Sequence, residues 1–127
     1  MKDVVRTEAA PAPFQGAPYS QAIKANGFVF VAGQVGIEPD NPQPVGDGIR
    51  AQTEQTLLNL RAILEAAGSG MNKLVKTTVF LTDLDDFQGM NEVYSRHVGD
   101  HPPARSTFEV AKLPPGLLVE IEAIALQ

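Results

Sequence analysis

Apolar and polar positions alternate in several short segments of the chain, and this pattern predicts β-strands. Residues 22–25 and 28–35 are β-rich pieces around Asn26-Gly27, a dipeptide typical of a two-residue hairpin turn. The second piece begins with the almost continuously apolar run 28–32, which is typical of a central strand. Apolar and polar side chains alternate again over residues 74–82. We therefore predict a hairpin near the N-terminus and a further strand in the middle of the chain.

Two amphipathic helices are predicted between and after these strands. Apolar and small residues recur every three or four positions from Ile49 to Ala67, with Asp47 as the predicted N-cap and Gly68 as the C-terminal stop. The second helix is predicted from Asp83 to about His97, ahead of helix-breaking Gly and Pro residues. Its predicted inward stripe consists of Leu84, Phe87, Met90, Asn91 and Tyr94.

The C-terminal stretch PPARSTFEVAKLPPGLLVEIEAIA, residues 102–125, contains two more β-patterned runs joined by a short Pro/Gly loop. Such a pattern predicts adjacent antiparallel strands. Arg105 stands at the head of the first run, and Glu120 and Glu122 lie on the second. Two interpretations remain open. The arginine and a glutamate form a cross-strand ion pair, or the guanidinium holds a substrate carboxylate while a glutamate handles a proton or a water.

The order of elements, β-β-(β)-α-β-α-β-β, predicts an α+β fold with a single mixed β-sheet and two helices on one face, formed by residues 1–127 as one domain. Residues 7–18 are expected to form an extended surface segment and residues 38–48 a turn-rich loop. The second sheet face also needs a cover, because Phe30, Val119, Ile121 and Ala123 are too apolar to leave in water. We therefore expect an oligomer in which sheets stack against each other.

Composition and charge narrow the classes of partner. The net charge is −5 and no Lys/Arg cluster appears, which disfavours nucleic acid and a polybasic membrane contact. No run approaches the roughly 18 apolar residues of a membrane span, and the first twenty residues do not resemble a secretory signal. The chain has no cysteine, so neither a disulfide nor a thiolate metal site is possible. We expect a cytoplasmic protein.

The common catalytic motifs have little support. His97 and His101 are four residues apart, but Gly99 lies between them, so a frayed helix end is the simpler interpretation than a zinc site. Neither Ser20 nor Ser106 lies in a G-x-S-x-G elbow. No glycine-rich phosphate loop follows a strand. The acidic cluster is interpreted as the negative first turn of a helix rather than as a catalytic group, and it consists of Asp83, Asp85 and Asp86.

Four blocks of the sequence resemble the RidA/YjgF family of enamine/imine deaminases. They are APYSQA (17–22), VAGQ (31–34), NLRAILEAAGSGMNKLVKTTVFLTDLDDFQGMNEVY (59–94) and PPARSTFEVAKLPPGLLVEIEAIA (102–125). The resemblance implies a fold like that of monofunctional chorismate mutase, in a barrel-like homotrimer with sites in the clefts between subunits. It also implies hydrolysis of 2-aminoacrylate/2-iminopropanoate and 2-iminobutanoate to 2-keto acids and ammonia, with no metal or cofactor.

The resemblance assigns roles to individual residues. Arg105 matches the family arginine that binds the substrate carboxylate, and Glu120 matches the glutamate that holds or activates the attacking water. Tyr19 and Asn91 match side chains that line the cleft. Backbone groups around Gly33 help to orient the ligand, as do those of Thr107.

The chain departs from the common family pattern at two positions. Ala32 stands where many members have serine, and Thr107 stands where many have cysteine. Because Arg105 and Glu120 remain, these departures bear on rate and substrate preference more than on the type of reaction. The alternative function is a non-catalytic small-carboxylate-binding or stress-responsive interaction protein that uses the same cleft. Chorismate mutase shares the fold only, since the chain lacks several cationic residues around one pocket.

Overall fold

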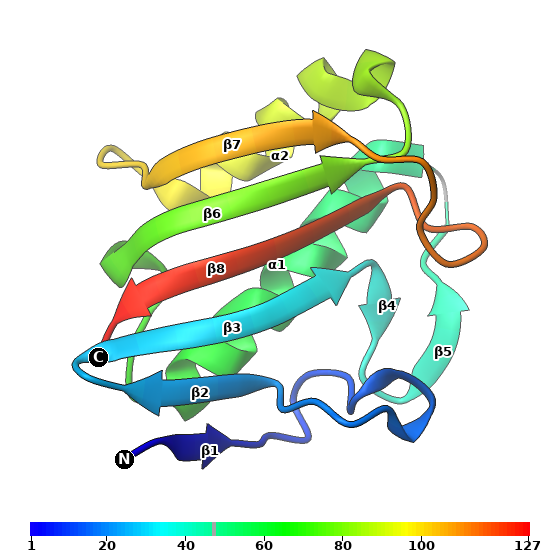
Figure 1. The fold of residues 1–127 in the computed structure, drawn as a ribbon. Helices are drawn as coiled ribbons and strands as arrows, with labels where there is room; N and C mark the ends of the chain where they lie inside the picture. Colours follow the sequence, from blue (N-terminus) through cyan, green and yellow to red (C-terminus); the bar gives the residue numbers. More distant parts are fainter. Residues whose placement is uncertain (47) are drawn as a thin grey trace.

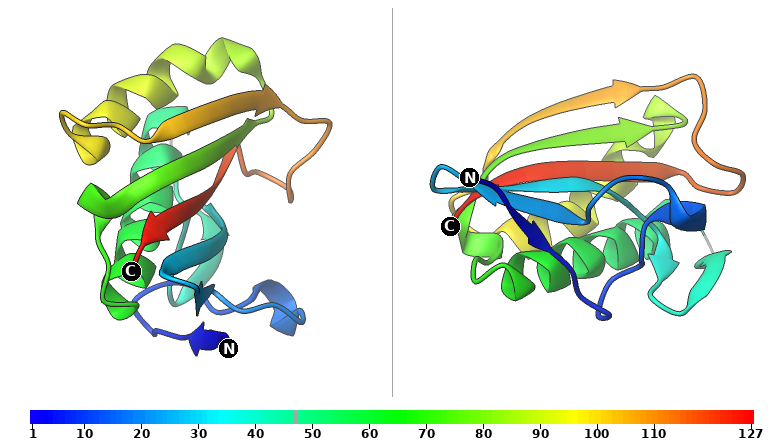
Figure 2. Two further views of the ribbon diagram at one scale, coloured as in Figure 1. Left: turned by 60° about the vertical axis from the view of Figure 1, so that its left-hand side comes forward. Right: turned by 60° about the horizontal axis from the view of Figure 1, so that its bottom comes forward.

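A six-stranded sheet forms the centre of the computed structural model, which describes residues 1–46 and 48–127. The strand order is β1-β2-β3-β8-β6-β7, and neighbours are antiparallel except for β6 and β7, which are parallel. Helices α1 and α2 lie together on one face of this sheet (Figures 1 and 2). The predicted α+β fold, with a mixed sheet and two helices on one face, is confirmed. The strands of the sheet are β1 Asp3–Val5, β2 Ala22–Ala25, β3 Phe28–Val35, β6 Leu74–Leu81, β7 Ala104–Glu109 and β8 Val119–Leu126.

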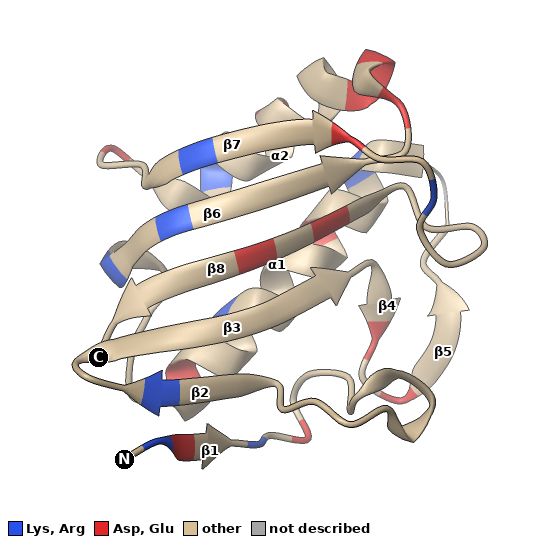
Figure 3. Ribbon diagram, in the orientation of Figure 1, with Lys and Arg blue, Asp and Glu red and all other residues tan. Residues whose placement is uncertain are grey.

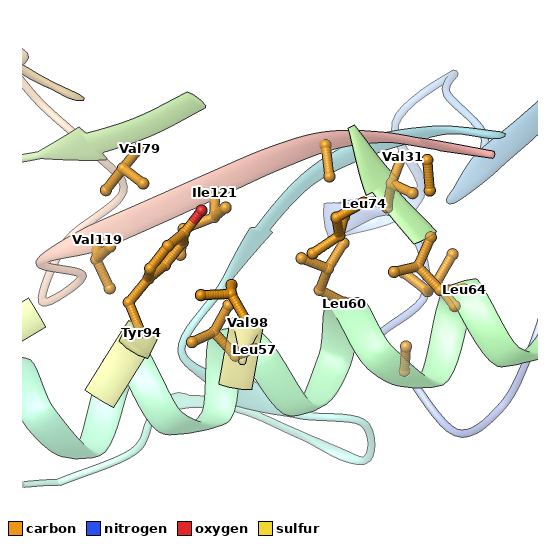
Figure 4. Packing of buried hydrophobic residues seen from close by; sticks show 14 of the residues in the cluster. Val31, Leu57, Leu60, Leu64, Leu74, Val79, Tyr94, Val98, Val119 and Ile121 are labelled. Carbon is orange, nitrogen blue, oxygen red and sulfur yellow. The ribbon is translucent and has the colours of Figure 1, made fainter. Parts of the chain in front are cut away.

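The hydrophobic core lies between the sheet and the helices α1 (Gly48–Ala66) and α2 (Phe87–Val98). Figure 4 shows side chains of both helices packed against those of the central strands. Burying a large aliphatic side chain contributes about 1.5–3 kcal/mol, so this one layer supplies most of the hydrophobic stabilisation. None of the helices in the described part of the chain is long and apolar enough to cross a membrane. Core residues that are fully or almost fully buried include Leu57, Leu60, Ile63, Leu64, Val79, Met90, Val119 and Ile121.

The turn signals in the sequence act as expected. Asn26 and Gly27 have φ angles of 53° and 83°, as a two-residue hairpin turn between β2 and β3 requires. Gly68 has φ 80° after α1, and the Ser69 amide donates to the Leu64 carbonyl at 2.8 Å. Asp83 caps a short 3-10 turn, η3 (Leu84–Asp86), by accepting a hydrogen bond from the next-but-one amide. The predicted N-cap of α1, Asp47, lies outside the described residues.

The predicted pairing of the two C-terminal strands is wrong, because β6 lies between β7 and β8. Helix α2 returns the chain to the end of the sheet where β6 began, so β7 enters parallel to β6 at the outer edge. Residues 110–118 then cross the end of β6, where Thr82 and Leu81 hold the two ends of the crossing by backbone hydrogen bonds. Strand β8 therefore enters on the inner side of β6 and pairs with both β6 and β3.

Segments predicted as irregular contain short regular elements. The expected loop 38–48 contains a small two-stranded sheet of β4 (Ile37–Glu38) and β5 (Asn41–Pro44). The expected extended segment 7–18 contains a 3-10 turn, η1 (Phe14–Gly16), and is tied down by Gln21. The Gln21 side chain donates hydrogen bonds to three backbone carbonyl oxygens of this segment and accepts one hydrogen bond from a backbone N–H of the same segment. A further 3-10 turn, η2 (Met71–Lys73), precedes β6.

Two predictions about side-chain orientation are wrong. Leu84 and Phe87 are 46% and 40% exposed, so the inward stripe of α2 is formed instead by residues such as Met90, Val93 and Tyr94. The side chains of Val119, Ile121 and Ala123 are buried beneath the helices and do not lie on the open face. That face nevertheless exposes other apolar side chains, namely Phe30, Phe108 and Leu126.

Candidate active site

Arg105 lies against two aromatic rings of α2. Its guanidinium carbon is 4.8 Å from the centroid of the Tyr94 ring and 5.5 Å from that of the Phe87 ring. The register places Arg105 beside Thr77 of β6, a buried residue, so Arg105 points to the face covered by the helices. Among the described residues, no carboxylate lies within ion-pair distance of Arg105. The cross-strand ion pair with Glu120 or Glu122 is therefore wrong.

Two unpaired polar atoms accompany the arginine. Asn91 is four residues after Phe87 and three before Tyr94, so it shares their face of α2. Thr107 is two residues after Arg105 and shares its face of β7. The Oδ1 of Asn91 and the Oγ1 of Thr107 are both buried without a hydrogen-bond partner among the described residues. Because buried polar atoms are rarely left unpaired, this cluster is one place in the described part of the chain where an external partner group is missing.

We call this cluster the arginine half-site. It consists of Phe87, Asn91, Tyr94, Arg105 and Thr107.

Glu120 lies on the opposite face of the sheet. Its neighbours along β8, Val119 and Ile121, are fully buried under the helices, so the Glu120 side chain points to the helix-free face. The carboxylate lies over the backbone of Gly33, in a stretch of β3 where the register shifts. A Cβ atom at position 33 would overlap the carboxylate and lie 2.8 Å from its carbon. The glycine therefore gives the carboxylate the space it occupies.

A hollow of about 310 Å³ opens next to Glu120. Tyr19 forms part of its wall, and its hydroxyl accepts a hydrogen bond from the Phe14 amide at 2.7 Å. Ala32 also lines the hollow, so the absence of a serine hydroxyl there makes the wall more apolar. We call this cluster the glutamate half-site, and it is lined by Phe14, Tyr19, Ala32, Gly33, Val35, Pro114, Leu117 and Glu120.

Two buried amides of α1 hold the loops around this hollow. Gln52 donates to the Gly116 carbonyl and accepts from the Leu118 amide, both at 2.8 Å. Asn59 donates to the carbonyls of Val35 and Ile37 at 3.0 and 2.8 Å. Neither residue was predicted from the sequence to belong to the site. Their signal was a polar amide recurring on the otherwise apolar stripe of α1.

The electrostatic environments of the two half-sites differ. Burial raises the pKa of Glu120, and the neighbouring Glu122 carboxylate raises it further. Burial also raises the pKa of Tyr94, although its hydrogen bond with Thr77 and the charge of Arg105 oppose that change. Glu122 lies further along the same face of β8 and borders a second hollow of about 210 Å³, together with Lys76 and Thr78. Among the described residues, no Lys or Arg lines the hollow beside Glu120.

The six residues assigned from the family resemblance fall into two groups of three. Asn91, Arg105 and Thr107 belong to the arginine half-site, and Tyr19, Gly33 and Glu120 border the glutamate half-site. Within one chain the two groups lie on opposite faces of the sheet, with β6 between their strands. Figure 3 shows the basic residue of β7 and the two acidic residues of β8 on strands separated by β6.

His97 is part of a packed contact between the helices rather than a frayed end. Its side chain is 7% exposed, its Nε2 lies 2.7 Å from the Glu54 carboxylate, and its Nδ1 lies 3.1 Å from the Arg61 guanidinium. Both ring nitrogens are thus engaged by side chains of α1. In the described part of the chain, no group of three or more His, Cys, Asp or Glu residues is placed to hold a metal ion.

Comparison with known proteins gives a consistent result. The model of the family described as endoribonuclease L-PSP matches residues 7–127. A RutC family protein of Pyrococcus horikoshii is 52% identical over 125 residues, which cover 98% of each chain. A mouse protein named 2-iminobutanoate/2-iminopropanoate deaminase is 44% identical over 127 residues, covering 100% of this chain and 93% of its own.

Solved structures agree with these sequence comparisons. The crystal structure of yeast Mmf1 has a TM-score of 0.94 at 42% identity and covers 100% of this chain and 99% of its own. That of TdcF from E. coli, which contains bound serine, has a TM-score of 0.90 at 36% identity and covers 98% of both chains.

Proposed function

This chain belongs to the endoribonuclease L-PSP family, which includes proteins named as RidA and imine deaminases, and we propose that it hydrolyses small 2-imino acids. The proposed substrates are 2-iminopropanoate with its enamine form 2-aminoacrylate, and 2-iminobutanoate. The products are 2-keto acids and ammonia. The observation that carries the proposal is the arginine half-site, in which Arg105 has no acidic partner among the described residues and lies beside two unpaired polar atoms. The Glu120 carboxylate, in a separate hollow, provides the complementary charge.

We propose that the site is completed where two copies of the chain meet. One copy supplies the arginine half-site and the next supplies the glutamate half-site, in a homotrimer. Three features support this arrangement: the two half-sites lie on opposite faces, the buried Oδ1 and Oγ1 atoms lack partners, and the helix-free face exposes apolar side chains. A three-fold, head-to-tail contact of this kind closes into a ring and repeats the same composite site at every interface.

In the proposed mechanism, Arg105 fixes the substrate by its carboxylate. A guanidinium presents two parallel N–H donors, which match the two oxygens of a carboxylate and fix the plane of the substrate. Holding the imine beside a water replaces a bimolecular encounter with a fixed geometry. The guanidinium carbon lies over both aromatic rings and no carboxylate among the described residues pairs with Arg105, so N–H donors remain for the ligand.

Glu120 handles the proton in this mechanism. Its carboxylate takes a proton from the water as the water oxygen bonds to C2 and the C=N π bond opens. Glu120 passes this proton to the nitrogen, which gives a carbinolamine with an OH and an NH2 group on C2. The hydroxyl proton is then also transferred to the nitrogen, the C2–N bond breaks, and ammonia leaves as the C2 carbonyl forms. Within one chain, burial and the Glu122 carboxylate raise the pKa of Glu120, which favours return of this proton near neutral pH, and Arg105 of the next copy acts in the opposite direction. No step requires a metal or an organic cofactor.

A coupled assay tests the proposed function. A threonine dehydratase generates the imine in solution, and release of the keto acid is followed with and without this protein. We expect the protein to accelerate release, and Glu120→Gln protein at the same concentration to serve as the control for non-specific effects. Failure to accelerate release would contradict the deaminase proposal. If 2-oxobutanoate still bound to the cleft, the result would favour a non-catalytic small-carboxylate binder.

The remaining features of the proposal follow from charge and composition. We propose a cytoplasmic protein, acting as one RidA-like domain over residues 1–127, with small molecules rather than nucleic acid or membrane as partners. Its net charge of −5 supports this choice, because binding to RNA or to an anionic membrane depends on concentrated positive charge.

A further inference from the structure

The Tyr94 ring that lies under Arg105 is fixed by a hydrogen bond of its own. The hydroxyls of Tyr94 and Thr77 are 2.6 Å apart, and both are buried. Tyr94 is 5% exposed, whereas Phe87, the other ring beside the guanidinium, is 40% exposed. A buried tyrosine hydroxyl with a partner holds its ring in one orientation, which a phenylalanine with no polar atom cannot do. The two rings therefore differ in role. The Tyr94 ring is held by its hydroxyl, whereas the Phe87 ring only covers the guanidinium.

The anchor of Tyr94 is the residue beside Arg105 in the sheet. In the parallel register of β6 and β7, Thr77 is the direct partner of Arg105. The three residues thus close a loop of contacts. The Thr77 backbone pairs with β7 at Arg105, the Thr77 hydroxyl holds the Tyr94 hydroxyl, and the Tyr94 ring lies 4.8 Å from the guanidinium carbon.

We infer that Thr77 and Tyr94 are positioning residues that fix the orientation of the Arg105 guanidinium, and so its affinity for the substrate carboxylate. Neither needs to touch the substrate. The inference rests on the proposed function, in which Arg105 binds that carboxylate. A planar cation that lies against a fixed ring keeps its in-plane donors in one direction, and bidentate binding depends on that direction. Loss of the anchor should therefore weaken ground-state and transition-state binding equally, which raises KM and leaves kcat nearly unchanged.

Two conservative variants break the same hydrogen bond from opposite sides. Tyr94→Phe keeps the ring and Thr77→Val keeps the branched shape. In steady-state assays and in titrations with 2-oxobutanoate, we expect each variant to raise KM and Kd by about three- to tenfold, with kcat within about twofold. The double variant should be no weaker than the weaker single variant, because both changes remove one interaction. Thr77→Ser keeps the hydroxyl and should restore wild-type values.

Two controls separate positioning from general destabilisation. Val29→Ala alters a fully buried residue of β3, which β8 and β6 separate from β7, so it should lower Tm without changing Kd. In an Arg105→Ala background, Tyr94→Phe should weaken the residual binding of 2-oxobutanoate no further, because the group it positions is gone.

The possible results distinguish this inference from the proposed function. If Tyr94→Phe lowered Tm but left Kd and KM at wild-type values, the pair would be structural only and the inference would be overturned. An effect of Tyr94→Phe that persisted without Arg105 would overturn it as well. If Arg105→Lys itself left binding and turnover unchanged, the carboxylate role of Arg105 would be wrong, and the proposed function would fail before the inference was tested.

Discussion

The arginine half-site and the glutamate half-site are built on different physical principles. Arg105 is held by aromatic packing and an anchored ring on the helix-covered face. Glu120 lies over a glycine backbone on the helix-free face, in a hollow whose loops are held by α1 amides. The first is preorganised and lacks an anionic partner, and the second is half-buried and lacks a cationic one. The arginine half-site contains the cation that Glu120 lacks, and the glutamate half-site contains the carboxylate that Arg105 lacks. The sheet separates the two half-sites within one chain.

The same difference appears in the electrostatics. Burial and Glu122 both disfavour the charged form of Glu120 in the single chain and so raise its pKa. A guanidinium supplied by a second copy would favour the charged form and oppose both. Complementary charges of this kind also favour one docking register over others. Under the proposed composite site, assembly and catalysis are linked, and the two half-sites can be tested separately.

The largest effect is expected from removing the proton acceptor of the glutamate half-site. Glu120→Gln keeps the shape but cannot take a proton, so turnover should fall about a thousandfold. Binding of 2-oxobutanoate, measured by titration, should weaken far less. Glu122→Gln is the matched control on the same face of β8. Equal losses in turnover and affinity would make Glu120 a binding residue, and a larger loss at Glu122 would move the role to that residue.

A smaller but still severe loss is expected in the arginine half-site. Arg105→Lys keeps the charge but loses the planar fork and its stacking, so kcat/KM should fall about a hundredfold while thermal unfolding stays close to wild type. Arg96→Lys, on an exposed part of α2 away from the half-site, is the matched control. Near wild-type deamination by Arg105→Lys protein would rule out bidentate carboxylate binding.

The pH dependence of activity tests the electrostatic environment of the glutamate half-site. If Glu120 acts as a base, activity falls as the pH drops through its pKa. Glu122→Gln removes one of the two causes that raise this pKa, so the acidic limb of the kcat/KM profile should move to lower pH. A limb that stays in place, or moves to higher pH, would show that Glu120 is not the titrating group. Glu65→Gln, at an exposed position of α1, should leave the profile unchanged.

The smallest effect is expected at position 107. The Oγ1 of Thr107 is buried without a partner, so Thr107→Val removes no hydrogen bond within the chain and should leave stability unchanged or slightly higher. Deamination should stay within about tenfold of wild type, which corresponds to roughly 1.4 kcal/mol. A loss of a thousandfold, with keto-acid binding intact, would show instead that the hydroxyl takes part in proton transfer.

Much of the fold could be predicted because the signals were local. The Asn-Gly turn, the helical spacing after Ile49 and the Gly68 stop each depend on nearby residues and each is present in the structure. Strand pairing was not local. The short link between β7 and β8 is typical of a hairpin, but the preceding helix had already placed β7 parallel to β6 on the outer edge, and the link crosses β6 instead.

The candidate site could be predicted in its residues but not in its arrangement. Strand alternation indicated that Arg105 and Thr107 share a face, and the structure agrees. It did not indicate which face, because a strand pattern has no absolute direction until its neighbours are known. The contact between Arg105 and Phe87 requires the Phe87 ring to face outward from α2. Helical periodicity had instead predicted that Phe87 lies in the core.

The most direct test of the central claim mixes two inactive proteins. Arg105→Ala and Glu120→Ala chains are prepared separately, each expected to be inactive, and then unfolded together and refolded at equal ratio. If every site takes its arginine from one copy and its glutamate from the next, about a quarter of the sites in random assemblies contain both, and activity should recover to about a quarter of wild type. A mixture that assembles normally but stays inactive would show that both residues must come from the same chain, and would contradict the account.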